Sequence, residues 1–428
     1  MTALDNFGLP ALGHTGLFGV FLAAHAVPDA LDVLHAGVGC KGKTQRHLVG
    51  HDLGRESHSQ VGWTELSEED LIVDAGAPLL RAIGELCGRR RPRVVLLSTS
   101  AAVDLTSLQV DALLDEAERA AGCPVVWLPQ ASRHPDLWAG YGAAVAGLAG
   151  RVDWSRPPAA RAGVALVGHL FHRYEADQAA DLGELTRLCR AVGLDCPAIL
   201  LGGVPFEQVL AAHRATALVR MPHAGLSTEA LSELSGRAVV AAGLPMGLGG
   251  CRAWLEALEA TGLVPAGESA RVLQREQARL APRLALARRL LGGRRVAVMA
   301  DTPAAAGWTA LCLDLGMRPG PVVLLDRSFG GAGAFHELVR WAHARPPADL
   351  EILEAPGLRR LRALEPAGVD LCLRPDLDLQ GTAWERVPAV PTGFPRTGQH
   401  GIFPVAELGF TGLIAQAQRL ADALGKLR

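Results

Sequence analysis

The chain has 428 residues, of which 49% are hydrophobic and 20% are charged, and a formal net charge of −2 at pH 7. This length predicts two or three domains, and the composition excludes an intrinsically disordered protein. The near-neutral charge disfavours nucleic acid as a partner, while the lack of a membrane-length apolar run or a secretory signal predicts a cytoplasmic protein without a membrane partner.

Apolar, strand-like runs alternate with helical stretches along the whole chain, a pattern typical of parallel sheets joined by crossover helices. In the first third, the predicted elements are the strands Asp32–His35, Val94–Ser98 and Pro124–Leu128 and the helices Leu79–Cys87 and Val110–Ala121. The proline-containing segment Asp153–Ala162 then reads as a linker.

Two further units follow. The predicted elements of the second are Gly163–Gly168, Leu182–Val192, Ala198–Leu201, Phe206–His213 and Leu218–Met221, before a long bridging helix at Ser269–Leu291. Those of the third are the strands Val296–Ala300, Val322–Asp326, Leu350–Leu353 and Val369–Leu373 and the helices Ala304–Leu315 and Gly357–Leu364. We therefore predict an α/β fold of three Rossmann-like domains, with parallel sheets flanked by helices, at residues 1–160, 161–292 and 293–428.

The stretch Gly37–Thr44 follows a predicted strand and fits two incompatible interpretations. Its sequence matches G-x-x-x-x-G-K-[ST], a loop whose backbone amides and lysine bind a nucleotide phosphate. In this interpretation Gly42, Lys43 and Thr44 hold the phosphate. Such a site also needs an acidic residue at the end of a neighbouring buried strand, but the strand Val94–Ser98 runs into Ser and Thr residues instead.

The second interpretation concerns Cys40, which lies on a glycine-flanked turn at the end of the strand. The eight cysteines include no C-x-x-C pair, which excludes zinc fingers and self-contained ferredoxin-type clusters. A lone thiolate cannot hold an iron–sulfur cluster, because such sites take about four ligands. If Cys40 binds iron, the remaining ligands must come from another chain. Otherwise it is a small packed residue.

Five segments, in order along nearly the whole chain, resemble the nitrogenase component 1 superfamily. They are Leu34–Cys40, Glu65–Gly76, Arg91–Leu105, Gly168–Leu194 and Val387–Gly412. The resemblance implies a subunit of three Rossmann-like domains that assembles with a homologous partner. It also implies that Cys40 is a metal ligand, because the cysteine of the first segment binds a cluster between subunits in this family.

The chain departs from full nitrogenase β-type subunits at two cluster positions, which correspond here to Gly62 and Ser100-Ala101. One cysteine per chain fits a [4Fe–4S] cluster with three ligands on the partner, and fits an eight-iron cluster poorly. The resemblance thus implies the β-type subunit of a nitrogenase-like two-component reductase. Its partners would be a homologous α-type subunit, in an α2β2 heterotetramer, and a separate ATP-dependent Fe–S reductase protein.

Two other functions remain open. A scaffold subunit, on which a complex iron–sulfur cofactor is assembled for another enzyme, would share the same cluster and symmetry. An independent P-loop NTPase would bind nucleotide as an isolated chain, lose that binding on Lys43→Ala and contain no iron.

Weaker candidates for binding a substrate or cofactor lie in two loops. His169 and Arg173 belong to a polar turn after a predicted strand, where ligands gather in open α/β sheets. The alternative is a polar loop at a helix start. Gly393 and Phe394 belong to a Gly-Phe-Pro loop that lies towards the subunit centre in proteins it resembles, and their alternative role is packing.

Overall fold

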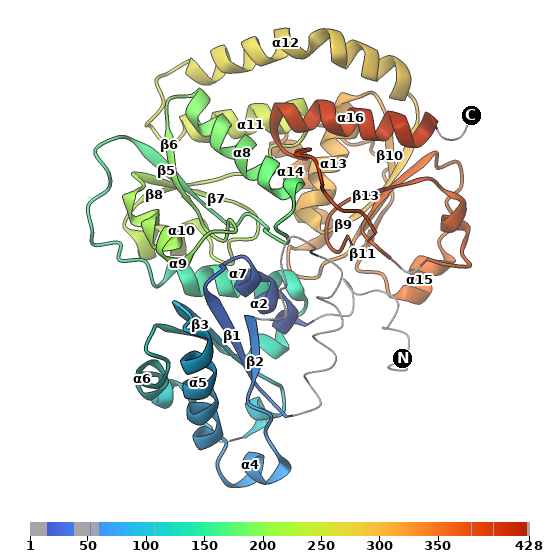
Figure 1. Cartoon of the computed structure of the whole chain (residues 1–428). Helices are drawn as coiled ribbons and strands as arrows, with labels where there is room; N and C mark the ends of the chain where they lie inside the picture. Colours follow the sequence, from blue (N-terminus) through green and yellow to red (C-terminus); the bar gives the residue numbers. More distant parts are fainter. Residues whose placement is uncertain are drawn as a thin grey trace.

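Three parallel sheets form the framework of the described part of the chain, one in each third (Figure 1). The computed structural model describes residues 15–37, 52, 60–106, 108–377, 379–396 and 398–425. All its strand pairings are parallel, so the strands of each sheet end at one common edge. The predicted α/β fold with three Rossmann-like units is confirmed, while the exact domain boundaries stay a prediction.

The first sheet has the strand order β2-β1-β3-β4. Its strands are β1 (Ala30–His35), β2 (Val61–Trp63), β3 (Val94–Thr99) and β4 (Val125–Leu128). Helices α5 (Gly76–Arg90) and α6 (Val110–Ala121) cover one face, and α2 (Gly16–His25) and α7 (Leu137–Ala149) cover the other. Three strands lie within two residues of their predicted bounds, whereas β2 has no predicted counterpart.

The second sheet has the order β6-β5-β7-β8. Its strands are β5 (Gly163–Val167), β6 (Asp195–Ile199), β7 (Ala217–Arg220) and β8 (Ala238–Ala241). The helices of this unit are α8 (Ala176–Ala191), α9 (Phe206–Leu210), α10 (Thr228–Ser235) and α11 (Gly247–Glu259).

The third sheet has five strands in the order β11-β10-β9-β12-β13. These are β9 (Arg295–Ala300), β10 (Arg318–Leu324), β11 (Ile352–Glu354), β12 (Leu371–Arg374) and β13 (Ala389–Pro391). Helices α13 (Thr302–Asp314), α14 (Gly331–Trp341) and α15 (Leu358–Ala363) connect them.

Two long helices join the second and third units. Helix α12 (Glu268–Leu291) matches the predicted bridging helix, and α16 (Gly409–Gly425) lies beside it across the top of both units (Figure 1). One hydrophobic core contains residues of both sheets and both helices. Among the described residues, no helix combines the length and apolarity needed to cross a bilayer.

Glycines let α2 and α7 pack with their backbones in contact. A Cβ on Gly19 would overlap the carbonyl oxygen of Leu137, and one on Gly140 would overlap the backbone of Gly16. A similar contact joins α7 to the second unit, where the backbones of Gly142 and the loop after β7 touch. This glycine contact therefore connects the first sheet to the rest of the chain.

The C-terminal segment, residues 392–396 and 398–411, is bound to α8 of the second unit by side-chain carboxyl groups. Glu175, Asp181 and Glu184 lie along this helix and accept hydrogen bonds from backbone amides of the segment at 2.5–3.1 Å. The donors are the amides of Gly401, Glu407, Leu408 and Thr411. The end of the third unit is thereby held against the start of the second.

We predict that Gly19→Ala destabilises the protein, because the added methyl group has no room between α2 and α7. Overpacking of this kind typically costs about 1–3 kcal/mol. Urea unfolding, followed by circular dichroism, would measure the loss. The matched control is Gly88→Ala in α5, where an added Cβ meets nothing within 4 Å. Equal midpoints for the two variants would contradict the close backbone contact.

A second prediction concerns pH. Burial, together with the neighbouring Glu407, raises the pKa of Asp181 to about 8. The folded protein therefore keeps a proton that the unfolded chain releases near pH 4, so this group lowers the free energy of unfolding as pH rises from about 4 to about 8.

The variant Asp181→Asn should remove that contribution, which amounts to a slope of about 1.4 kcal/mol per pH unit. Urea unfolding at several values between pH 5 and 8 would measure it. Asp115→Asn, an exposed substitution on α6, controls for the loss of one charge. Unchanged pH dependence in Asp181→Asn would show that the carboxyl is ionised in the folded protein.

Candidate functional site

The carboxyl edge of the first sheet holds the main candidate from the sequence. Gly37 leaves this edge directly after β1 and forms a parallel bridge to the chain that follows β2. Cys40 comes three residues later. It lies outside the described residues, as do the alternative phosphate-binding residues Gly42, Lys43 and Thr44. Their roles stay predictions.

Buried polar groups lie at this edge. His35 places its Nδ1 3.0 Å from the Thr64 hydroxyl, while its Nε2 has no hydrogen-bond partner in the described part of the chain. The Ser100 amide donates to the His35 carbonyl at 3.0 Å, and the Ser100 hydroxyl is buried without a partner there. Burial lowers the pKa of His35 to about 4, so its imidazole is neutral at pH 7.

The two positions that correspond to further cluster cysteines supply no thiol. Gly62 lies within β2, and a Cβ on it would come 2.5 Å from Leu86 of α5. Ser100 lies at the edge itself. The seven free thiols of the described residues lie in or beside α5 and α6 or in the other two units. Within that part of the chain, no three His, Cys, Asp or Glu side chains could together hold a metal ion.

The side chain of Asp104 lies at the end of β3, where the sequence pattern had indicated no acidic residue. The Thr99 hydroxyl donates to one oxygen of Asp104, and the Ser132 hydroxyl donates to the other at 2.8 Å. Both carboxylate oxygens are therefore engaged with protein groups. This arrangement disfavours Asp104 as the magnesium-binding acid of a phosphate-loop site.

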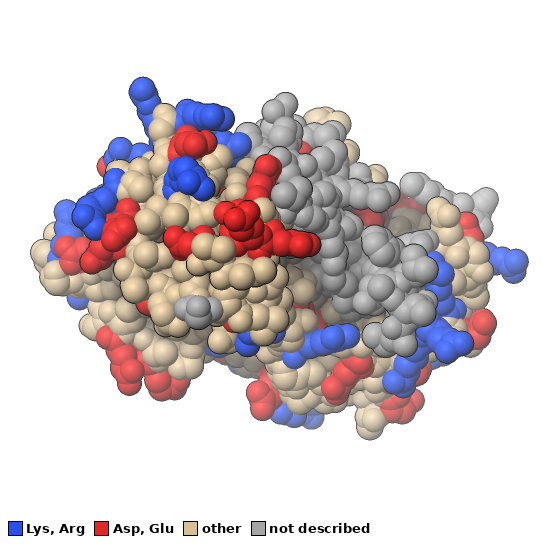
Figure 2. Space-filling model, turned by 90° about the horizontal axis from the view of Figure 1, so that it is seen from below, with Lys and Arg blue, Asp and Glu red and all other residues tan. Residues whose placement is uncertain are grey.

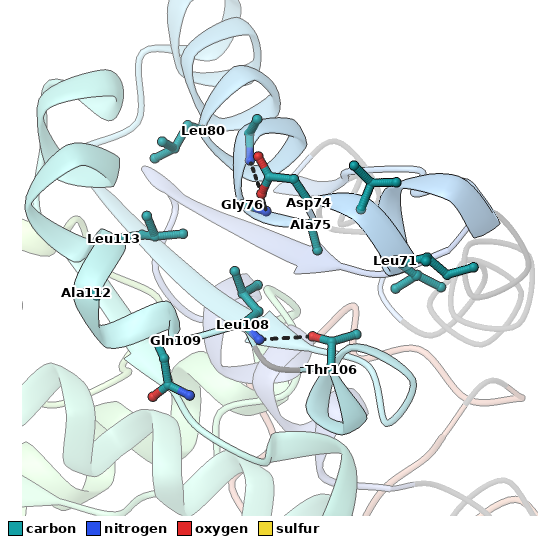
Figure 3. Close-up of a pocket in the computed structure, with 13 residues that line it drawn as sticks. Leu71, Asp74, Ala75, Gly76, Leu80, Thr106, Leu108, Gln109, Ala112 and Leu113 are labelled. Carbon is teal, nitrogen blue, oxygen red and sulfur yellow. Dashed lines mark hydrogen bonds between the residues drawn. The ribbon is translucent and has the colours of Figure 1, made fainter.

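Three large apolar side chains are exposed around the same end of the first unit. Ile72 and Val73, which end α4 (Glu68–Val73), are 84% and 75% exposed, and Leu105 is 81% exposed. Beside them is a pocket of about 480 Å³ between α4, α5 and α6, with Leu71, Asp74, Leu108 and Leu113 in its lining (Figure 3). Neighbouring exposed apolar side chains of this size mark an interaction surface.

The same surface is acidic. The first turn of α4 contains Glu68, Glu69 and Asp70, and Ser67 caps it through the Asp70 amide. Acidic side chains gather on the face seen from the α4 side of the molecule (Figure 2). A partner that buries Ile72 and Val73 would therefore match this surface best with basic groups around an apolar centre.

A second candidate lies where the carboxyl ends of the second and third sheets meet. His169 and His223 follow the neighbouring strands β5 and β7, and Asp301 follows β9. Together with Gly393, which follows β13, they line a cavity of about 70 Å³. This volume holds a few water molecules and is well below the roughly 300–1,000 Å³ typical of ligand pockets.

Of the four weaker candidates from the sequence, the structure brings His169 and Gly393 together on this cavity. Arg173 does not line it. Its fully buried guanidinium pairs with Asp177 and donates to a C-terminal backbone carbonyl at 2.8 Å. Phe394 packs in the core against a phenylalanine of α2, with the ring centroids 5.8 Å apart. The roles of all four as cofactor-binding residues stay predictions.

Several cavity residues were missed by the sequence analysis. They are Asp181, His223, Asp301, Arg396 and Glu407. Two of them could have been found from the sequence. His223 and Asp301 come just after predicted strands, and ligands of parallel α/β sheets bind at the carboxyl ends of the strands. Burial and the neighbouring His223 lower the pKa of His169 to about 3. The imidazole of His169 is therefore neutral at physiological pH.

Comparisons with known proteins agree with this geometry. A family model described as nitrogenase component 1 type oxidoreductase matches residues 15–425. The nitrogenase iron-molybdenum cofactor biosynthesis protein NifE of Clostridium pasteurianum is 22% identical over 197 residues, which cover 46% of this chain and 42% of that protein. The solved structure of nitrogenase Cp1 at pH 6.5 is similar with a TM-score of 0.80 at 16% identity, covering 98% of this chain and 93% of that one. Nitrogenase Cp1 at pH 5 gives a TM-score of 0.71 at 14% identity, covering 95% and 88%.

The solved structures are evidence for the fold, whereas the family model is evidence for the family. The structural similarity, at such low identity, shows the fold, and the chain covers less than half the length of the NifE relative. The family model, in contrast, spans the strand before Cys40, the exposed surface of α4 and the cavity at His169. The chain therefore belongs to the family of nitrogenase component 1 type oxidoreductases.

Proposed function

We propose that this chain is the β-type subunit of a nitrogenase-like two-component reductase. In this proposal Cys40 supplies one ligand to a [4Fe–4S] cluster that is shared with a homologous α-type subunit in an α2β2 assembly. The family supports the general class, because its members bind iron–sulfur clusters and work with a reductase component. The electron donor would be a separate ATP-dependent Fe–S protein.

The observation that carries this proposal is the lack of a second thiol at the carboxyl edge of the first sheet. Gly62 and Ser100 occupy the corresponding positions, and the free cysteines of the described residues lie elsewhere. Since iron–sulfur clusters take about four ligands, a cluster on Cys40 would need ligands from another chain. The proposed cluster and the proposed subunit pairing thus depend on each other.

The described polar residues at the ends of β1 and β3 suit such a site. When bound, the cluster would pass single electrons between the donor protein and the active site. Neutral His35 and the Ser100 hydroxyl each retain hydrogen-bonding capacity at the strand ends. Polar groups next to a cluster, together with burial, set its reduction potential. We therefore assign His35 and Ser100 a supporting role around the Cys40 thiolate.

The exposed surface at the end of α4 suits the electron donor. Ile72 and Val73 end α4, the helix after β2. Gly37, which follows β1, bridges to Leu66 just before this helix, so the surface lies at the same edge of the first sheet as the start of the segment that contains Cys40. The acidic first turn of α4 would attract a basic rim on that protein and raise its association rate. In this proposal, the reduction itself takes place mostly on the cofactor of the α-type subunit or in a cavity between the two chains.

The similarity to NifE favours a second candidate, a scaffold subunit for assembly of a complex iron–sulfur cofactor. Both functions need the same cluster and the same pairing. Steady turnover of a small-molecule acceptor by the purified complex would support the reductase. Release of an iron–sulfur cofactor to an apo-enzyme would support the scaffold.

We predict that the chain purified anaerobically from its host carries a homologous partner and about four irons per pair. The variant Cys40→Ala should lose that iron and the matching acid-labile sulfide. Iron and sulfide analysis of both preparations would measure this. Cys196→Ala, which removes a half-buried thiol of the second unit, serves as the matched control and should retain the iron.

Other results would overturn the proposal. Full iron content in Cys40→Ala would exclude this residue as a ligand. An iron-free single chain that binds ATP, and loses ATP on Lys43→Ala, would instead support the phosphate-binding interpretation of Gly42, Lys43 and Thr44.

We also predict that Ile72→Asp and Val73→Asp weaken docking of the electron donor. A charge in the centre of an apolar contact should raise the donor concentration for half-maximal electron transfer at least tenfold, which corresponds to about 1.4 kcal/mol. The measurement is the initial rate against donor concentration with ATP in excess. Leu286→Asp, at a half-exposed position on α12, controls for an added surface charge. Equal effects at all three positions would contradict the assignment of this surface.

A further inference from the structure

The cavity between the second and third sheets contains two histidines that the proposed function does not use. His169 and His223 both line it and are only 4% and 3% exposed. Each ring makes a hydrogen bond through Nε2, but neither Nδ1 has a partner in the described part of the chain. Buried polar atoms are rarely left unpaired, so each Nδ1 is available to a small molecule in the cavity.

The hydrogen-bond network fixes the tautomer of His169. The side-chain oxygen of Gln178 accepts from the His172 amide at 3.3 Å, which turns the Gln178 amino group towards His169. That amino group lies 2.8 Å from the His169 Nε2 and can only donate. Nε2 therefore accepts, and the neutral ring carries its proton on Nδ1. The unpaired Nδ1 of His169 is a hydrogen-bond donor.

His223 has the opposite tautomer, because its Nε2 faces a carboxylate. Its Nε2 lies 3.2 Å from a carboxylate oxygen of Asp301, and that same oxygen accepts from the Ala304 amide. A carboxylate accepts, so the His223 Nε2 carries the proton. In the neutral ring the Nδ1 then has a lone pair. The unpaired Nδ1 of His223 is thus a hydrogen-bond acceptor.

We propose that this cavity binds a small neutral ligand that accepts from the His169 Nδ1 and donates to the His223 Nδ1. Water has this chemistry, and the cavity of about 70 Å³ takes a few molecules. A small alcohol or amide has the same chemistry in a similar volume. The ligand would connect the strand ends of β5 and β7. This inference stands apart from the cluster edge and does not rest on the proposed function.

A crystal structure of the purified complex, at a resolution that shows ordered water, tests this proposal. We expect density about 3 Å from both Nδ1 atoms. Separate peaks identify water, whereas continuous density for three or four atoms identifies a small alcohol or amide. An empty cavity, or a protein group hydrogen-bonded to either Nδ1, would overturn the proposal.

A pair of variants separates ligand binding from packing. His223→Asn keeps an acceptor near the position of Nδ1 and should retain the density. His223→Leu removes the acceptor and should lose the density next to residue 223, with the backbone unchanged. Density that persists unchanged in His223→Leu would show that His223 does not hold the ligand. Thermal unfolding of both variants shows whether each one folds.

Discussion

The contact between α8 and the C-terminal segment determines the geometry of the junction between the second and third units. Carboxylates of α8 bind backbone amides of this segment, and the buried Arg173–Asp177 pair lies at the start of the helix. The segment itself contributes an Arg396–Glu407 pair at 2.7 Å. Because the two ion pairs are buried, each charge needs its partner in place, and removing one partner would leave an uncompensated charge. The cavity at His169 depends on this arrangement, since Arg396 and Glu407 also line it.

The two candidate sites differ in what they need from outside the chain. The described residues at the carboxyl edge of the first sheet supply no thiol, so the proposed cluster on Cys40 would need its other ligands from a partner chain. The exposed apolar side chains of Ile72 and Val73 and the acidic first turn of α4 lie at the same end of the first unit. Such a surface is typical of a region that contacts another protein. The cavity of the other two units is small and partly open to solvent. In the proposed function, electron transfer would involve the first unit, whereas the junction of the other two units would mainly hold the chain together.

Much of the fold could be predicted from the sequence because its central strands are continuous apolar runs. Strands β1, β3 and β9 are almost wholly buried and lie close to their predicted bounds. Strands β2, β8 and β13 were missed because β2 and β13 have only three residues each and β8 is a half-buried edge strand. No helical periodicity identified α2 or α7, since both are buried on nearly all sides.

The candidate sites were less predictable. His169 could be found because it follows a predicted strand directly, and Gly393 because it belongs to a recognisable loop. The contacts that surround them join residues more than 200 positions apart, such as Glu175 with His400. A pattern of neighbouring residues cannot predict a contact between residues so far apart in the sequence. The exposure of Ile72 and Val73 was equally hidden, because their apolar character would ordinarily place them in a core.

A cryo-electron microscopy structure of the complex, purified without oxygen, tests the shared cluster most directly. We predict one cluster at the boundary between this chain and a homologous subunit, with the Cys40 sulfur as the only ligand from this chain. A metal-free Cys40, or a nucleotide phosphate held by Gly42, Lys43 and Thr44, would contradict that prediction.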